Sequence, residues 1–167
     1  MAVSTDSIKA LREKSGAGVI ECRNILVETD GDIEKAVCLL KERGFAKAAK
    51  KAERVTKQGL VEAYVHAGGR IGAMIELNCE SDFVARTAEF KELAHNIAMQ
   101  VAAMSPTYIT AEDVPEGAEV VIETDCLLKQ AYIRDPGMII NDLIVALISK
   151  VGENIRVSRI ARFELGK

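Results

Sequence analysis

The stretch from 76 to 86, ELNCESDFVAR, brings a hydroxyl, a carboxylate and a phenyl ring together at the end of an alternating apolar run. Ser81 is a residue type that caps helices, so the chain is expected to leave a strand here and begin a helix. Asp82 and Phe83 follow directly, on a short and stiff corner. Aromatic residues make up only 4% of the chain, so this Phe needs an explanation. It either packs beneath the new helix as a hydrophobic staple or contacts a partner.

The sequence carries no pattern typical of a catalytic or metal-binding site. The cysteines do not pair at two-residue spacing, and neither His66 nor His95 stands at zinc-finger distance from such a pair. No nucleophile neighbours either histidine, and no glycine-rich phosphate loop precedes a helix. We therefore predict that the chain is not an enzyme and needs no cofactor or metal. Reduced and mostly buried thiols are expected at Cys22, Cys38, Cys79 and Cys126.

An alternating strand leads into the corner. Apolar residues alternate along residues 61–65 and again along 71–77, and Ala67-Gly68-Gly69-Arg70 between them suits a tight hairpin turn. After the corner, apolar residues at helical spacing from Phe90 to Val101 predict an amphipathic helix that ends before Ser105-Pro106. The hairpin and this helix are expected to share one apolar core.

Three short helices are predicted before the hairpin. The first ends near Gly16, the second runs from about Val19 to Glu28, and the third is expected to end at Gly44. A basic, helix-prone segment follows the third helix. The predicted domains are a three-helix partner-docking module at 1–44, a helical linker at 45–58 and an α+β core at 59–167.

Residues 106–137 show the weakest patterns in the chain. Thr110–Pro115 is typical of a capped turn, whereas Leu127–Tyr132 fits either a helix or a strand.

The final part again shows clear periodicity. Apolar spacing from Ile140 to Val151 predicts a helix that Gly152 ends. Residues 154–165 alternate as a strand with apolar side chains at odd positions, and a β-bulge is expected at 159–160, where the alternation breaks. The predicted fold class is α+β, with a small antiparallel sheet packed against helices.

The composition is that of a globular chain, with 49% hydrophobic and 28% charged residues among 167. A net charge of −3 disfavours a strongly basic nucleic-acid binder, and the basic run Lys41–Lys57 has no interleaved aromatic residue apart from Phe45. No signal-peptide pattern begins the chain, and no stretch approaches the ~20 apolar residues that span a bilayer. We expect a cytoplasmic protein that binds neither nucleic acid directly nor a membrane.

Residues 76–86 closely resemble the second signature of the bacterial elongation factor Ts family, with Ser81 where the family usually has Thr. In that family, the Asp and Phe of this motif are driven between two helices of the GTPase domain of elongation factor Tu, near its nucleotide and magnesium site. The resemblance implies a partner-binding set of Ser81, Asp82, Phe83 and Val84 that dislocates the Mg²⁺ site. It also implies a guanine nucleotide exchange factor that binds GDP-bound elongation factor Tu and promotes GDP release until GTP binds.

Residues 11–26, LREKSGAGVIECRNIL, resemble the first signature of the same family, and residues 152–166, GENIRVSRIARFELG, resemble its ending. The resemblance implies a front module like a ubiquitin-associated domain that docks on elongation factor Tu through Ile20 and Arg23. Arg23 stands where the family usually has Lys, which keeps the charge and changes the donor geometry. Without the resemblance, Ile20 could equally belong to the core of the bundle, and Arg23 could be a solvated charge.

Short forms of the family suggest a homodimer, since this chain has room for one core subdomain where long forms carry two. The region 106–137 is curtailed relative to the family pattern, and the resemblance covers most of the chain except about residues 106–126. The open edge of a small sheet makes pairing between copies physically plausible. A second hypothesis, of another class, is a ubiquitin-associated binding module joined to an α+β interaction domain, which only the front third of the chain supports.

Overall fold

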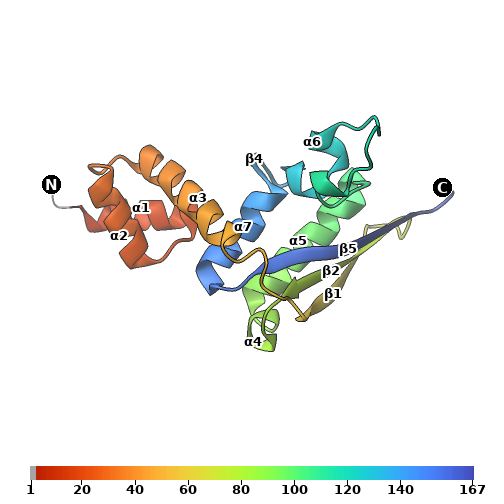
Figure 1. Ribbon diagram of the computed structural model, residues 1–167, viewed down its shortest axis with the longest axis horizontal. Helices are drawn as coiled ribbons and strands as arrows, with labels where there is room; N and C mark the ends of the chain where they lie inside the picture. Colours follow the sequence, from red (N-terminus) through yellow and green to blue (C-terminus); the bar gives the residue numbers. More distant parts are fainter. Residues whose placement is uncertain (1–2) are drawn as a thin grey trace. The chain divides into compact units, whose positions relative to one another are not determined.

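The computed structural model describes residues 3–167 and divides the chain into two compact units. The front unit contains the chain up to Glu53 together with Val145–Gly152, and the body unit contains Arg54–Ile144 together with Glu153–Lys167. The first is helical, and the second combines a sheet with helices (Figure 1). The α+β class predicted from the sequence is confirmed. The three-part domain division stays a prediction.

Three helices build the front unit around one apolar cluster. They are α1 (Thr5–Ser15), α2 (Val19–Glu28) and α3 (Ile33–Ala49). The Ser4 Oγ caps α1 by accepting a hydrogen bond from the Ser7 N–H at 3.0 Å, and Gly16 ends the helix in the left-handed conformation, with φ of 66°. Asp32 caps α3 in the same way. The cluster between the helices consists of Leu11, Cys22, Ile25, Leu26 and Ala36.

The third helix does not end at Gly44, as the sequence predicted, but continues to Ala49. Gly44 is buried, and a Cβ at this position would lie 3.2 Å from Ser149 Oγ and 3.3 Å from Val145 Cγ1. Both residues belong to α7 (Ile140–Val151) and to the front unit. Gly44 therefore allows α3 and α7 to approach closely. In the sequence alone, a glycine at this position is equally typical of a helix end.

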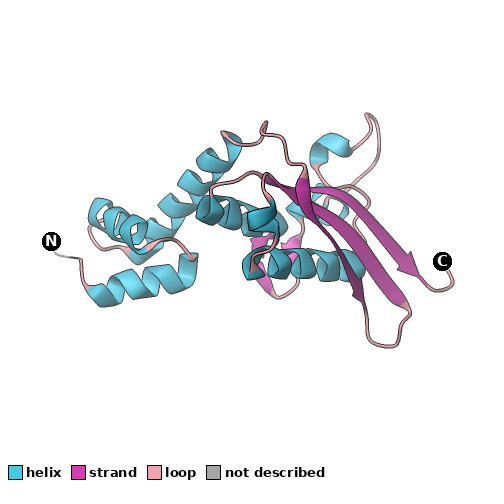
Figure 2. Ribbon diagram, turned by 90° about the horizontal axis from the view of Figure 1, so that it is seen from below, coloured by secondary structure: helices cyan, strands magenta, loops and turns pink. Residues whose placement is uncertain are grey.

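The body unit contains a three-stranded antiparallel sheet with α5 (Ala88–Met104) against its inner face (Figure 2). The strand order is β1-β2-β5, with bounds Gln58–Val65, Ile71–Cys79 and Ile155–Glu164. The predicted hairpin and the helix after it are confirmed. The largest fully buried side chains between the sheet and α5 include Ile75, Leu77, Phe90, Ile97 and Val101.

A β-bulge interrupts the pairing of β5 with β2. Two neighbours on β2, Glu76 and Leu77, pair with Arg159 and Val157, so Ser158 is the extra residue on β5. The bulge expected from the broken alternation is therefore present, one position earlier than predicted.

After the bulge, the odd- and even-numbered side chains of β5 exchange faces of the sheet. Ile160 pairs with the buried Ile75 and lies on the inner face, whereas Phe163 is 71% exposed on the outer face. The apolar residues at odd positions therefore lie on different faces before and after the bulge, since one inserted residue reverses the alternation.

The segment between α5 and α7 folds as short pieces joined to α5 by two buried glutamines. Gln100 of α5 donates from Nε2 to Gln130 Oε1 at 3.1 Å and accepts at Oε1 from the Ile133 N–H at 2.9 Å. The predicted capped turn is confirmed, because the Thr110 N–H donates to Asp113 Oδ2 at 2.8 Å. The pieces are η1 (Ala111–Asp113), α6 (Ile122–Asp125), η2 (Leu127–Lys129), β3 (Ala131–Tyr132) and β4 (Asp135–Ile139).

Within residues 3–167, no helix combines the length and the apolar character needed to cross a bilayer. The same residues contain no cluster of three His, Cys, Asp or Glu side chains arranged to hold a metal ion. All four cysteines are free thiols; Cys38 is exposed, and the other three are buried.

Candidate partner-binding site

The strand-to-helix corner predicted at Ser81 is confirmed. β2 leads into α4 (Asp82–Ala85), and the Ser81 Oγ accepts a hydrogen bond from the Val84 N–H at 3.4 Å. The same device begins α5, where Thr87 Oγ1 accepts from the Phe90 N–H at 3.3 Å. Two capped helix starts in succession restrict the backbone on both sides of α4.

Phe83 projects from α4 into solvent, with 79% of its surface exposed. The next two residues, Val84 and Ala85, are buried and anchor α4 to the body unit. The staple interpretation, in which Phe83 packs beneath the following helix, is therefore wrong. An exposed phenyl ring on an anchored helix can be buried by a partner, which is worth ~1.5–3 kcal/mol for a large apolar side chain.

Asp82 lies beside Phe83 and pairs with Arg86 across one helical turn, with 2.8 Å between Oδ2 and the guanidinium nitrogen. Because this ion pair is solvent-exposed, it contributes at most ~1 kcal/mol, and a partner's donor can replace Arg86 at little cost. Of the four predicted corner residues, Asp82 and Phe83 present side chains to solvent. Ser81 serves as the cap and Val84 as the anchor.

Cys79 is buried at the end of β2, directly beneath the corner. Its thiol donates to the Ser81 carbonyl oxygen, with 3.1 Å between Sγ and O. Burial, with a smaller contribution from the negative charge of Glu153, raises the pKa of Cys79 to about 11. The thiol is therefore protonated at neutral pH and acts as a hydrogen-bond donor within the corner.

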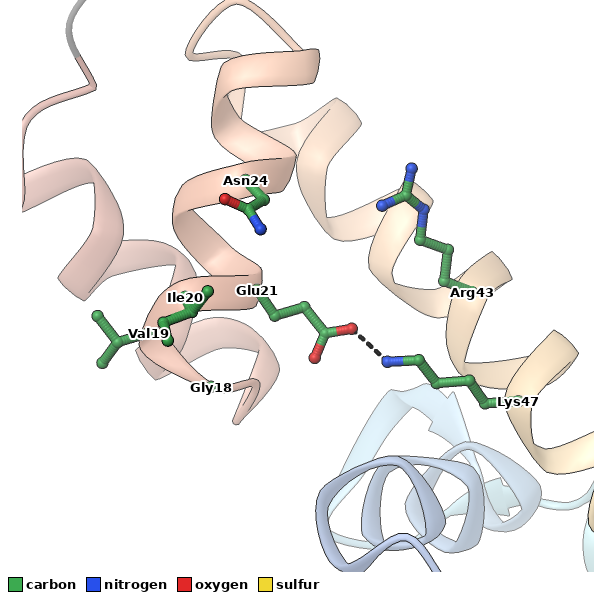
Figure 3. A pocket seen from close by; sticks show the side chains of 7 residues that line it. All are labelled: Gly18, Val19, Ile20, Glu21, Asn24, Arg43 and Lys47. Atoms are coloured by element: carbon green, nitrogen blue, oxygen red, sulfur yellow. Dashed lines mark hydrogen bonds and ion pairs between the residues drawn. The ribbon is translucent and has the colours of Figure 1, made fainter.

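The start of α2 forms a second apolar surface, in the front unit. Ile20 is 76% exposed, so the alternative in which it belongs to the bundle core is wrong. It borders an open groove between α2 and α3, across which Lys47 Nζ donates to Glu21 Oε1 at 2.5 Å (Figure 3). Arg23 is exposed on α2 and does not line the groove. The lining residues are Gly18, Val19, Ile20, Glu21, Asn24, Arg43 and Lys47.

Two polar residues at these sites were missed by the sequence interpretation. Glu153 accepts hydrogen bonds from Ser81, 72 positions away, and Lys47 reaches Glu21, 26 positions away. Neither contact has a signature within a local sequence window. The one available signal for Glu153 is its position directly after Gly152, where the chain leaves a helix and is free to turn back.

The fold is that of a small α+β protein that exposes two apolar surfaces, one at Phe83 and one at Ile20. The family model described as Elongation factor TS matches residues 33–131. The chain is 50% identical to elongation factor Ts of Thermotoga neapolitana, over all of this chain and 99% of that relative. It is 48% identical to elongation factor Ts of Thermotoga maritima, over 100% and 98% of the two chains. The chain therefore belongs to the elongation factor Ts family of translation elongation factors.

A third relative, elongation factor Ts of Caldanaerobacter subterraneus, is 45% identical, with 99% of this chain and 98% of the relative covered. The alignment with the Thermotoga neapolitana protein runs over 195 positions, whereas this chain has 167 residues. That relative therefore carries residues without a counterpart in this chain.

Proposed function

We propose that this protein is a guanine nucleotide exchange factor. It binds GDP-bound elongation factor Tu and promotes release of GDP by disturbing the Mg²⁺ and phosphate site until GTP binds. Membership of the elongation factor Ts family supports elongation factor Tu as the partner. The corner at 81–84 acts on the nucleotide site, and Ile20 and Arg23 of the front unit dock on the same partner.

The exposure of Phe83 is the observation that carries the proposal. A large apolar side chain that is 79% exposed gains free energy when a partner removes it from water. The cap at Ser81 and the buried Val84 restrict α4 in the free protein, so little ordering is needed on binding. A restricted aromatic side chain of this kind is suited to enter a gap between two helices of another protein.

The mechanism follows from how a GTPase holds GDP. Its phosphate loop and a Mg²⁺ ion neutralise the diphosphate, so their geometry determines the affinity for nucleotide. If Phe83 separates two helices near this site, the elements that position the ion move and GDP loses several contacts at once. No covalent bond forms or breaks, so the protein acts as a factor and not as an enzyme.

Coupling between the two ligands makes the exchange reversible. A protein that weakens GDP binding to elongation factor Tu is itself bound less tightly when GDP is present, because coupling free energies are reciprocal. An incoming nucleotide therefore expels the factor, and GTP completes the cycle when it is in excess. Release passes through a ternary complex of factor, GTPase and nucleotide.

The required energies are compatible with this surface. Accelerating release by ~10³-fold needs a barrier lowered by ~4 kcal/mol. Burial of one phenyl ring supplies ~1.5–3 kcal/mol, so Phe83 carries a large share but not the whole effect. The remainder comes from Asp82 and from the docking surface around Ile20.

The test is the release of a fluorescent GDP analogue from elongation factor Tu, chased with unlabelled GDP, at increasing concentrations of this protein. We expect the release rate to rise with concentration and to reach a plateau, as a ternary complex requires. Release at the spontaneous rate throughout the titration would refute the proposal. Binding to ubiquitin in its place would support the second hypothesis from the sequence.

We further propose that the protein is a homodimer through the outer face of the sheet. Val65 of β1, Gly72 of β2 and Phe163 of β5 pair in one row of the sheet, and Phe163 is 71% exposed. The next row contains Ala63, Met74 and Ala161. Large exposed apolar patches on soluble proteins mark interaction sites.

A second copy of the chain suits this face because the charged row beside the two apolar rows is already paired. The row after the two apolar ones contains Glu76 and Arg159, joined by a 2.6 Å hydrogen bond. The two apolar rows can therefore meet the same rows of a second copy without an unpaired charge from the adjoining row, in the manner of stacked sheets. A cytoplasmic location fits both proposals and stays a prediction.

A further inference from the structure

The loop that follows α7 bonds to the corner that carries Phe83. The Ser81 N–H donates to Glu153 Oε2 at 2.9 Å, and the Ser81 Oγ donates to Glu153 Oε1 at 2.6 Å. One carboxylate therefore accepts from both the backbone and the side chain of the residue that caps α4. Hydrogen bonds to an ionised carboxylate are stronger than those between neutral groups.

The bonding is reciprocal between the two segments. The Asn154 N–H donates to Glu80 Oε1 at 2.6 Å, so each segment supplies a carboxylate to the backbone of the other. The Arg54 guanidinium lies 3.5 Å from the same Glu80 oxygen, and Asn154 Nδ2 donates to the Arg54 carbonyl at 2.9 Å. We call the four residues Glu80, Ser81, Glu153 and Asn154 the carboxylate clasp. All of them belong to the body unit.

The carboxylate clasp bonds to the start of α4, a helix too short to keep its orientation by itself. α4 has only four residues, too few for a helix to be stable by its internal hydrogen bonds. Its orientation therefore depends on the burial of Val84 and Ala85 and on the cap at Ser81. The Ser81 hydroxyl accepts from the Val84 N–H while it donates to Glu153, so Glu153 fixes the hydroxyl that caps the helix.

We propose that Glu153 is a positioning residue for nucleotide exchange, whose carboxylate holds the Ser81 corner so that Phe83 is presented to the partner in one direction. The inference rests on the proposed exchange function. It adds a residue 70 positions from Phe83 in sequence that touches neither nucleotide nor the inserted ring. Preorganisation of this kind raises the rate of a step without adding a contact to the partner.

The substitution Glu153→Gln tests the clasp because it keeps the size of the side chain and removes its charge. The amide replaces one of the two carboxylate oxygens by a nitrogen that is itself a donor, so one of the two Ser81 donors loses the acceptor that it faces. We expect the GDP release rate at saturating factor to fall by about tenfold, the equivalent of one strong hydrogen bond. The matched control is Glu62→Gln, which removes a carboxylate that pairs with His95 at 3.0 Å elsewhere in the body unit. It should leave release within about twofold of the parent.

A double-mutant cycle separates positioning from a general structural role. If Glu153 acts through Phe83, Glu153→Gln has little further effect once Phe83→Ala has removed the ring. If the two losses multiply, Glu153 acts elsewhere and the inference is wrong. Release by the single Glu153→Gln variant at the parent rate would also overturn it. If that variant does not fold, Ser81→Ala and Ser81→Thr are compared instead, and only the Thr variant should retain the parent rate.

Amide hydrogen exchange measures the effect of the carboxylate clasp on backbone stability in the free protein, without elongation factor Tu. In the full chain, Glu153→Gln should accelerate exchange at 81–85 and leave 71–78 unchanged, because the β2 ladder does not depend on the clasp. Unchanged protection at 81–85 would contradict the inference. If the parent protein fails to accelerate GDP release, the exchange function fails, and the hydrogen-exchange result still decides whether the clasp holds the corner.

Discussion

Phe83 and Val84 are neighbours in the chain but lie in opposite environments. A substitution at Phe83 therefore removes an exposed side chain, and one at Val84 removes core packing. Phe83 is exposed and Val84 is buried, so loss of the first side chain spares the fold and loss of the second leaves a cavity. Ser81 differs from both because its hydroxyl serves a cap and the carboxylate clasp at once. Of these three residues, only Phe83 can be substituted to test partner binding without also changing the stability of the fold.

The substitution Arg23→Ala tests the proposed docking surface of the front unit. The Arg23 side chain is exposed, so Arg23→Ala should weaken association with elongation factor Tu several-fold and leave the melting temperature unchanged. We expect the difference from the parent to shrink as salt rises from 50 to ~300 mM, since exposed charges are screened. Calorimetric titration at both salt concentrations measures it. A salt-independent difference would mean that the contact is buried in the complex.

The raised pKa of Cys79 predicts that the stability of the fold falls at alkaline pH. The pKa of Cys79 is raised by burial to about 11 in the folded protein, against about 8.5 for a free thiol. Protonated Cys79 therefore stabilises the fold fully below pH ~8.5, and this contribution is lost as pH rises toward about 11. Urea unfolding from pH 8 to 11 should show a steeper loss for the parent than for Cys79→Ser. Equal slopes would contradict the assignment.

At the scale of elements, the predictions that succeeded rest on local chemistry. The cap at Ser81, the glycine turn between β1 and β2 and the helical spacing of α5 each reside in a few neighbouring residues. The features placed wrongly depend on distant partners. Gly44 serves contact with α7, and the bulge at Ser158 is defined by pairing with β2. From the local sequence alone, a glycine in a close helix contact looks the same as a glycine that ends a helix. A bulge at Ser158 likewise looks the same as a bulge one residue later.

The close helix approach at Gly44 gives a prediction for the front unit. Gly44→Leu should destabilise the protein by ~1–3 kcal/mol, because Val145 and Ser149 leave no room for a large side chain. Ala46→Leu on the exposed side of α3 is the matched control and should be close to neutral. Thermal unfolding followed by circular dichroism compares them. A Gly44→Leu variant as stable as the parent would show that α3 and α7 separate easily.

At the scale of the whole molecule, family resemblance nominated the corner, and its exposure could not be derived from the sequence. A Phe next to a helix start is equally consistent with a staple, and the outcome depends on which face α4 turns to the core. Val84 and Ala85 fill that face, which leaves Phe83 outside. The groove beside Ile20 was likewise hidden because α2 and α3 form it together.

The outer face of the sheet predicts the oligomeric state. We expect light scattering to give twice the 18.1 kDa of one chain, and Phe163→Asp to shift the protein toward the monomer, because a buried unpaired charge opposes association. Val121→Asp, at an exposed apolar residue outside the sheet, is the control and should remain dimeric. A parent protein that is monomeric at micromolar concentration would contradict the dimer proposal.

The most direct test of the central claim is the GDP release rate from elongation factor Tu at saturating concentrations of the parent and of Phe83→Ala. We predict that the variant releases GDP roughly 10- to 100-fold more slowly, with a melting temperature within ~2 °C of the parent, since the lost ring is solvent-exposed in the free protein. Release at the parent rate, or a large drop in melting temperature, would contradict the account.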